Sequence, residues 1–307
     1  MTVLIIGLGS IANKHISILK QLYKDLTIYA WRSAPQPDED KGITNIYNLG
    51  ELPQTPDFVI IANPTHLHLD ALKNCIPLDV PVMIEKPLTD GPGYKVIDNY
   101  IREIEKHHIL TYVACNLRFH DAITFLKAHL PGKRINEVNV YCGSWLPGWR
   151  QGKDFRTFYS VDPNAGGGVH LDLIHELDYC YWLFGKPEKV TGTKTNNSSL
   201  SIRSADYATY NLRYKDFSVN ITLNYYRVDA KREIEILFED STWTVNLLTC
   251  CIRDHKGNVL FIKEDYNVMD TYREQMKYFV SHIQSGQPPM NSAKESSEIL
   301  KWCLVNE

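Results

Sequence analysis

The sequence predicts two domains: an N-terminal α/β domain on a parallel sheet and a C-terminal α+β domain with a large, mainly antiparallel open sheet. At 307 residues the chain is long enough for two hydrophobic cores. In the first part, short β-branched runs alternate with helical periods, which is typical of βαβ units. From residue 190 to 260 strand patterns dominate, and their alternation predicts an antiparallel sheet with one covered face. We place the domains at residues 1–118 and 119–307.

The individual elements follow from hydrophobic periodicity. A helix is expected at 11–22, because Ile11, Ile16 and Leu19 return to one helical face. The strands expected in the first domain are 3–6, 26–31, 58–62, 82–84 and 109–114. In the second domain we expect helices at 122–128, 168–184, 270–284 and 293–305, and strands that include 219–226, 233–238 and 242–248.

Charge and composition exclude several classes of partner. With 33 basic and 36 acidic residues the net charge is -3, which gives no field for nucleic acid or an anionic membrane. No apolar run reaches the roughly 18 residues of a membrane helix, and the start lacks the basic segment of a signal peptide. The seven cysteines form no CxxC pair, so we expect free buried thiols. We therefore expect a cytoplasmic protein without nucleic-acid or membrane partners.

A glycine-rich turn follows the first predicted strand. Gly7, Gly9 and Ala12 form a G-x-G-x-x-A loop, with Ser10 and Ile11 opening the predicted helix. Gly7 permits the tight turn, Gly9 lets a pyrophosphate approach the backbone, and Ala12 allows close helix packing. The helix N-terminus offers free N–H groups to the phosphates. These residues predict a dinucleotide site of the Rossmann type.

The end of the second predicted strand bears on the choice of cofactor. An acid usually stands there to bind the adenosine ribose. This chain instead has Arg32 and Ser33, and Asp38, Glu39 and Asp40 follow later. An arginine and a serine can bind a 2'-phosphate. We therefore expect NADP(H) to be preferred, with an exposed Arg32 and bound NAD(H) as the alternative.

Four further segments carry polar residues of the kinds that active sites use. They are residues 60–68 (IIANPTHLH), 85–87 (EKP), 116–119 (NLRF) and 166–178 (GGGVHLDLIHELD). With the glycine turn they resemble, in order and over nearly the whole chain, the glucose-fructose oxidoreductase, inositol dehydrogenase and rhizopine-catabolism family of sugar dehydrogenases. The resemblance implies hydride transfer between a nicotinamide and a secondary alcohol or ketone of a sugar or sugar derivative. It also implies that the nicotinamide faces a cleft floored by the second domain's sheet.

Three residues are candidates for the chemistry. Dehydrogenating an alcohol needs a proton acceptor and a positive group near the developing oxyanion. Lys86 ends a strand at the ligand-bearing edge and can donate to the substrate oxygen, while His175 can accept the proton. Asp172, three residues before His175, can orient the imidazole or bind a sugar hydroxyl. The resemblance implies these roles. In the family pattern the histidine follows the aspartate by four residues, whereas His175 follows Asp172 by three. Asp172 is therefore alternatively a structural helix residue.

Further residues are expected around the cofactor and the substrate. Those expected to line the cofactor are Asn63, Pro64, Thr65, His68 and, at the nicotinamide ribose, Glu85. His170, Asp172 and His175 have no zinc-type spacing, so we expect no metal.

An aromatic loop is expected to contact the substrate. Trp149 and Tyr159 offer aromatic faces that suit sugar rings, and Arg150 suits a carboxylate or phosphate. Arg118 is either an ion-pair residue or a substrate contact. Lys86, Asp172 and His175 complete the expected substrate-binding set. A tryptophan–arginine loop ahead of the glycine triplet resembles family members of bacterial surface-glycan pathways, which implies a nucleotide-linked sugar.

Two other functions stay open. One is an enzyme of the same fold that uses bound NAD for elimination or glycoside cleavage, and the other is a non-catalytic nucleotide sensor. The presence of both Lys86 and His175 argues against the sensor. By resemblance we also expect a cis peptide between Lys86 and Pro87. We expect a homodimer or homotetramer through the C-terminal sheet, because strand 220–226 offers apolar and aromatic residues that no helical layer obviously covers.

Overall fold

The computed structural model describes residues 1–34 and 42–305. Contacts group the chain into two units, Met1–Cys115 with Tyr272–Ser297, and Asn116–Thr271 with the residues from Glu298 on. The segment 272–297 therefore groups with the N-terminal part of the chain, which the sequence pattern did not indicate. The division into domains 1–118 and 119–307 remains a prediction.

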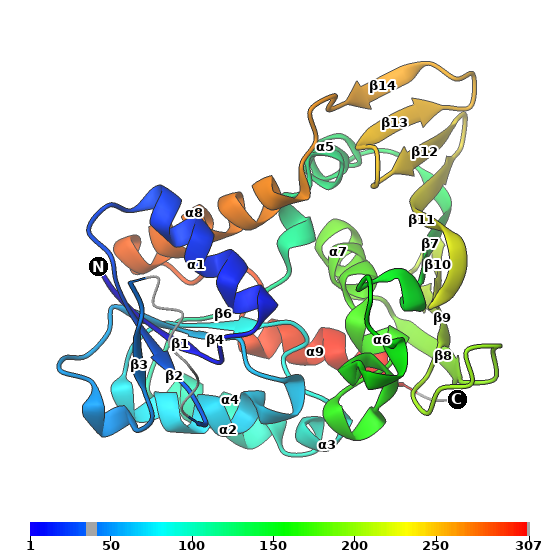
Figure 1. The fold of residues 1–307 in the computed structure, drawn as a ribbon. Coiled ribbons are helices and arrows are strands. Elements are labelled where there is room, and N and C mark those ends of the chain that lie inside the picture. Colours follow the sequence, from blue (N-terminus) through cyan, green and yellow to red (C-terminus); the bar gives the residue numbers. More distant parts are fainter. Residues whose placement is uncertain (35–41, 306–307) are drawn as a thin grey trace. The chain divides into compact units, whose positions relative to one another are not determined.

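The first unit is built on a parallel sheet (Figure 1). In the part of the chain that the structure describes, its six strands follow the order β3-β2-β1-β4-β5-β6, and all neighbours run parallel. The order reverses between β1 and β4, and open α/β sheets bind ligands outside the carboxyl ends of the strands at such a reversal. The strands are β1 Thr2–Ile6, β2 Thr27–Trp31, β3 Thr44–Ile46, β4 Phe58–Ile61, β5 Val82–Glu85 and β6 Thr111–Ala114. Five of them were predicted, and β3 was missed because three residues carry too little alternation.

Helices cover this sheet and complete the core of the first unit. They are α1 Ser10–Leu22, α2 His68–Cys75, α3 Gly91–Tyr94 and α4 Ile97–Lys106, and most of α8 Val268–Ser285 groups with them. The residues of β1, β4 and β5 are buried along their whole length. Continuous apolar strands of this kind follow from helices on both faces of a parallel sheet. The core therefore holds the carboxyl ends of these strands rigidly in place.

The second unit contains an eight-stranded sheet, counted over the described residues. Its order is β14-β13-β12-β11-β7-β10-β9-β8, with β10 and β7 parallel and the other pairs antiparallel. The strands are β7 Ile135–Trp145, β8 Lys189–Thr195, β9 Tyr207–Arg213, β10 Ser218–Asn224, β11 Tyr226–Phe238, β12 Thr242–Asn246, β13 Cys251–Asp254 and β14 Val259–Ile262. The mainly antiparallel sheet is confirmed. The long strand β7 was missed, although its apolar residues alternate with polar ones.

One face of this sheet is apolar and the other is polar. Along β10, Val219, Ile221 and Leu223 are buried, whereas Asn220 is exposed and Thr222 is half-buried. The short helix α6 packs against β9 and β10. The apolar residues of 220–226 thus lie on the covered face, so the expectation of an uncovered apolar face is wrong. The other face carries a polar row in which Asn211 donates to Asn220, and Asn220 to Asn139.

The predicted helix 168–184 is also wrong in its continuity. The chain forms α6 Val169–Asp172 and α7 His175–Phe184, separated by two residues. Leu173 ends α6 with a ψ of 30°, which is not helical. Asp172 and His175 therefore stand on two helices, and the i,i+3 geometry of a single helix does not apply to them.

The remaining elements connect these layers. The other helices are α5 Asp121–His129 and α9 Ala293–Leu304, close to the expected bounds. The short 3-10 helices are η1 Leu49–Glu51, η2 Thr65–Leu67, η3 Ile76–Leu78, η4 Asn116–Phe119, η5 Leu146–Gly148, η6 Phe155–Thr157, η7 Tyr159–Val161 and η8 Pro163–Ala165. All seven cysteines are buried, as expected. Within 1–34 and 42–305, no helix has the length and apolarity needed to cross a membrane.

Candidate functional site

The glycine turn between β1 and α1 has the geometry of a dinucleotide loop. Gly7 has a φ of +84°, and a Cβ there would lie 2.7 Å from the Cα of Asn63. Both facts exclude a side chain at Gly7. At Gly9 a Cβ would meet no atom of the described residues within 4 Å. Packing therefore does not require a glycine at that position, and the open space above its backbone fits a close-approaching ligand.

Helix α1 begins directly behind this turn. Gly9 is its N-cap, no side chain of residues 1–34 or 42–305 caps it, and its first turn contains no acidic residue. Ser10 is exposed and Ala12 is fully buried, so the helix packs closely while its first turn stays accessible. A 13-residue helix with an uncapped, uncharged N-terminus attracts anions. The residues present therefore fit the pyrophosphate of a dinucleotide.

The residues after β2 are accessible. The backbone N–H of Arg32 donates to the carbonyl of Ile46 on β3, which fixes where the arginine leaves the sheet. Arg32 is half-buried and Ser33 is exposed. Neither these two residues nor Ala34 is acidic. Asp38, Glu39 and Asp40 lie outside the described residues.

The loop after β4 contacts the glycine turn. The backbone of Asn63 lies against Gly7, and Pro64 is exposed while Thr65 is buried. The ring of His68 is buried between two backbone carbonyls: its Nε2 lies 3.0 Å from the oxygen of Asn63 and its Nδ1 3.0 Å from that of Pro87. Burial lowers the pKa of His68, although the carbonyl contacts oppose this shift. His68 therefore links the loops after β4 and β5.

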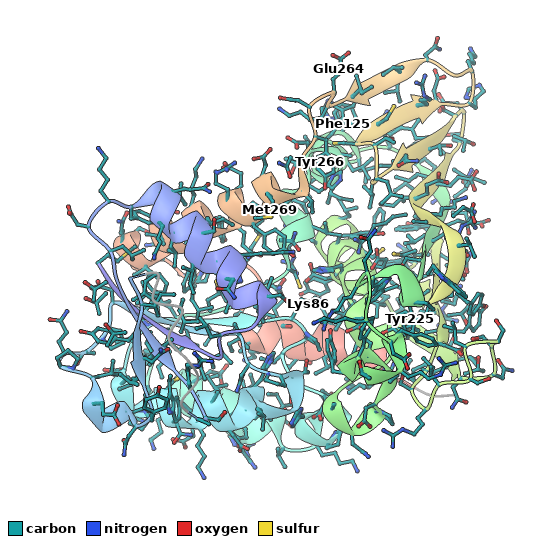
Figure 2. The ribbon with its side chains drawn as sticks, viewed as in Figure 1. Lys86, Phe125, Tyr225, Glu264, Tyr266 and Met269 are labelled. Atoms are coloured by element: carbon teal, nitrogen blue, oxygen red, sulfur yellow. The ribbon has the colours of Figure 1, made fainter. Side chains whose placement is uncertain are left out.

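The segment after β5 contains Lys86. The Lys86–Pro87 peptide is cis, which confirms the expectation. Lys86, which is labelled in Figure 2, follows β5 directly and is half-buried. The carboxylate of Glu85 lies 2.6 Å from Nε2 of His15 on α1 and accepts the backbone N–H of Lys86. His15 was not predicted as a site residue, and the signal that could have found it is its place on the buried stripe of α1, between Ala12 and Ile16.

The glycine triplet of the second unit shapes the approach to α6. Gly166 adopts the left-handed conformation that ends η8. A Cβ on Gly167 would lie 2.2 Å from the carbonyl oxygen of Tyr159, and Gly168 has a φ of +132°. Each position therefore requires glycine for a local steric reason. The close approach at Gly167 holds the backbone of Tyr159 beside α6.

Asp172 lies at the centre of a cluster in the second unit. Its Oδ1 accepts the Tyr159 hydroxyl at 2.6 Å, and its Oδ2 accepts the Tyr225 hydroxyl at 2.5 Å. Trp149 packs edge-on against Tyr225, with ring centroids 5.3 Å apart. We call these four residues the Asp172 cluster. Three of them were predicted. Tyr225, which lies beside α6 in Figure 2, was missed as a site residue because it was expected only as part of the strand 219–226.

The Asp172 cluster combines a buried carboxylate with accessible aromatic surface. Asp172 is 6% exposed, whereas Trp149 is 39% and Tyr159 44% exposed. Burial, followed by the Asp172 charge and hydrogen bond, raises the pKa of Tyr159 and that of Tyr225 far above the usual value. Both hydroxyls therefore stay protonated at neutral pH and donate to the carboxylate.

His175 and the two arginines complete the predicted residues. His175 is the first residue of α7 and is buried. The guanidinium of Arg150 lies over the ring of Phe158, 4.9 Å from its centroid. Arg118 forms a buried, bidentate ion pair with Asp178, through contacts of 2.9 and 2.8 Å. Of the two alternatives for Arg118, the structure contains the ion pair.

The glycine turn and the sheet that carries it define a class of protein. An open glycine turn, an uncapped helix and a reversing parallel sheet are the features of a dinucleotide-binding Rossmann domain. Residues 1–114 match the model of the oxidoreductase family with an NAD-binding Rossmann fold, and residues 126–244 match the Gfo/Idh/MocA C-terminal domain. The two matches together cover most of the chain. The protein belongs to the Gfo/Idh/MocA family of NAD-binding oxidoreductases.

The chain is similar to known proteins over part or nearly all of its length. The chain is 25% identical to myo-inositol 2-dehydrogenase of Thermotoga maritima, over 98% of this chain and 93% of that one. It is 28% identical to 2,7-anhydro-N-acetylneuraminate hydratase of Mediterraneibacter gnavus, over 45% of this chain and 36% of the relative. Among solved structures, UDP-N-acetylglucosamine 3-dehydrogenase of Acidithiobacillus ferrooxidans aligns with a TM-score of 0.79 at 18% identity, covering 99% of this chain and 95% of that one.

Proposed function

We propose that this oxidoreductase transfers a hydride between a nicotinamide and a secondary alcohol or ketone of a sugar or sugar derivative. The observation that carries the proposal is the Asp172 cluster, in which a fixed carboxylate lies among half-exposed aromatic rings. Aromatic faces bind the C–H face of a sugar, and polar groups beside them select its hydroxyls. The full-length similarity to an inositol dehydrogenase supports the same substrate class.

The cofactor would be held by the first unit. Gly7, Gly9, Ser10, Ile11 and Ala12 would receive its pyrophosphate. Asn63, Pro64, Thr65 and His68 would line the cofactor, and Glu85 would meet its nicotinamide ribose. When bound, a nicotinamide accepts or donates a hydride.

NADP(H) would be preferred over NAD(H). Arg32 and Ser33 stand where an acid would bind the ribose hydroxyls, and both are at least partly accessible. An arginine pairs with a 2'-phosphate through charge-assisted hydrogen bonds. The family is described as NAD-binding, so NAD(H) remains the alternative cofactor.

The chain's own residues would handle the proton and the oxyanion. His175 would take the proton from the substrate hydroxyl, and Lys86 would donate a hydrogen bond to the oxygen as its charge develops. Tyr159 is unsuited to be the base, because its raised pKa keeps the hydroxyl protonated. Asp172 would hold Tyr159 and Tyr225 in place rather than act on His175 alone. Trp149, Arg150 and Tyr159 would bind the substrate, whereas Arg118 would act through its ion pair.

The test is to identify what the protein binds and turns over. The purified protein is denatured and its released ligands are identified by mass spectrometry. A panel of sugars, inositols and nucleotide-linked sugars is then screened with NAD(H) and NADP(H) for a change in absorbance at the nicotinamide band. We expect oxidation or reduction of at least one polyol or sugar, with stoichiometric cofactor conversion. Tight cofactor binding without turnover of any member would favour a sensor instead.

A second candidate is a reaction without net redox change. The relative from Mediterraneibacter gnavus is named a hydratase, and hydration consumes no net hydride. An enzyme of this kind would use bound NAD for transient oxidation that enables elimination or glycoside cleavage. Product formation without net conversion of the cofactor would identify it.

Partners and location follow from the same proposal. We expect a homodimer or homotetramer through the C-terminal sheet, in the cytoplasm, with no nucleic-acid or membrane partner and no metal. The polar row on β9, β10 and β7 supplies hydrogen-bonding groups that a second copy could meet.

A further inference from the structure

Two buried histidines hold the segment Glu85–Lys86–Pro87 of the first unit at its two ends. Nε2 of His15 lies 2.6 Å from Oε1 of Glu85, and Nδ1 of His68 lies 3.0 Å from the carbonyl oxygen of Pro87. His15 is fully buried and His68 is 2% exposed. Lys86, between the two anchored residues, is half-buried. The placement of the lysine thus depends on two side chains from α1 and α2.

Glu85 transmits the contact with His15 to the backbone of Lys86. A buried carboxylate needs hydrogen-bond partners to offset its loss of water. Oε1 of Glu85 has the imidazole of His15, and Oε2 accepts the N–H of Lys86 at 3.2 Å. The carboxylate therefore connects α1 directly to the peptide unit from which the Lys86 side chain leaves.

His15 belongs to α1, the helix that begins at the nucleotide turn, and His68 on α2 contacts the loop that faces this turn. Nε2 of His68 lies 3.0 Å from the carbonyl of Asn63, the residue whose Cα faces Gly7. The Glu85–Pro87 segment is thereby tied to the glycine turn on both sides.

We infer that His15 is a positioning residue that, through Glu85, fixes Lys86 relative to the nucleotide turn. The inference rests on the catalytic role proposed for Lys86. It also adds a role for Glu85, whose carboxylate serves the protein backbone as well as any cofactor contact. The competing role for His15 is simple packing, because it lies on the buried stripe with Ala12 and Ile16.

Matched substitutions separate the hydrogen bond from packing. His15→Gln retains an N–H donor at about the reach of Nε2, whereas His15→Asn keeps a polar amide that is too short. His15→Leu fills similar space without a donor. Ile18→Ala is the control, because Ile18 is buried on the same helix and has no polar side-chain atom. Thermal unfolding establishes that each variant is folded.

Lys86 is monitored with and without a substrate. Without one, trace acetylation of the full-length protein followed by peptide mass spectrometry reports the reactivity of the Lys86 amine, and NADH fluorescence reports cofactor affinity. With a substrate from the screen, kcat and KM are measured separately. A small displacement of a reacting group can cost about 100-fold in rate. We expect His15→Leu and His15→Asn to lower kcat by about 100-fold with little change in KM, and to raise Lys86 acetylation. His15→Gln should keep kcat and the acetylation of Lys86 close to their wild-type values.

The outcomes are decisive in each direction. If His15→Leu does not fold, the comparison of His15→Asn with His15→Gln carries the test. The inference would be overturned if His15→Asn and His15→Gln behaved equally. It would also be overturned if Lys86 reactivity and kcat in the His15 variants were no different from those in Ile18→Ala. The Lys86→Ala variant distinguishes failure of the role inferred for His15 from failure of the proposed function. If Lys86→Ala has wild-type turnover, the lysine has no catalytic role and the proposed function of Lys86 fails. If Lys86→Ala is inactive while His15→Asn behaves like the wild type, only the role of His15 is rejected.

Discussion

At the scale of single residues, His175 is buried at the first position of α7. We expect His175→Ala to lower turnover by about 100- to 10,000-fold, because a general base contributes a factor of this size. Cofactor affinity should stay unchanged, since the substitution removes no proposed cofactor contact. The measurement is single-turnover hydride transfer together with NADH titration. His255→Ala, in an exposed turn of the second unit, is the control, and a near-wild-type rate for His175→Ala would assign the proton transfer to another group.

Arg32 is the residue on which the cofactor preference depends. We expect the wild type to bind NADPH more tightly than NADH, because Arg32 is accessible beyond β2 and can pair with the 2'-phosphate. Arg32→Ala should weaken NADPH binding by about 10-fold or more, the range of a lost charge-assisted hydrogen bond, and should leave NADH binding unaltered. Fluorescence titration of both cofactors measures this, with Arg102→Ala on α4 as the control. Unchanged preference in Arg32→Ala would mean that another group selects the cofactor.

At the scale of elements, the glycine triplet decides where α6 begins. A Cβ on Gly167 would lie 2.2 Å from a backbone oxygen, a distance that no rotamer change relieves. We expect Gly167→Ala to destabilise the protein by about 1–3 kcal/mol, as overpacking in a core does. Urea denaturation measures the change. Gly50→Ala, whose nearest contact would be 3.5 Å, should differ from the wild type by only about 0.5 kcal/mol.

Gly167→Ala also tests whether this turn places the Asp172 cluster. The backbone that would move belongs to Tyr159, whose hydroxyl donates to Asp172. Substrate binding should therefore weaken in Gly167→Ala under conditions where the protein is still folded. A folded variant with normal substrate affinity would show that α6 does not depend on the triplet.

At the scale of the whole molecule, histidines whose pKa is lowered by folding make stability depend on pH. Burial, followed by the charge of Lys194, lowers the pKa of His170 to about 3. In the unfolded chain a histidine titrates near 6.5, so between these values the unfolded state binds more protons. The free energy of unfolding should therefore fall as the pH decreases from about 6.5 toward 3. Burial lowers the pKa of His68 and of His120 in the same direction.

His170→Gln isolates one contribution to this pH dependence. The slope of unfolding free energy against pH below 6.5 should become smaller in this variant, because a titrating group has been removed from the difference between the two states. Urea denaturation at several pH values measures the slope, and His255→Gln, at an exposed position, should leave it unchanged. Equal slopes in the wild type and His170→Gln would contradict the expectation.

The assembly of the molecule can be tested through the same sheet. We expect a dimer or tetramer at micromolar concentration in sedimentation velocity, formed through the polar face of the C-terminal sheet. Asn220→Lys places a charge in the middle of that row, where Asn220 joins Asn211 and Asn139. It should therefore shift the protein toward the monomer, whereas Glu103→Lys on α4 should not. A monomeric wild type would contradict the prediction.

By itself, the sequence determined the fold class of each domain and the role of the glycines in the turn after the first strand. Alternating periods along the chain report local burial, so the parallel and the antiparallel sheets could be predicted before their strands were paired. Gly7 and Gly9 could be assigned because the reason for each lies within a few residues of the turn. The cis peptide at Lys86–Pro87 was expected from the family resemblance and not from a local reason of this kind.

Only the tertiary structure decided which side chains meet. His15 meets Glu85 across 70 residues and Tyr225 meets Asp172 across 53, and no local period reports such a contact. The helix break between Asp172 and His175 was also invisible, because it depends on packing against other elements. Periodicity specifies which residues are buried. Partner choice among buried polar groups is set by the fold as a whole, because each must find its hydrogen bond wherever the packed chain supplies one.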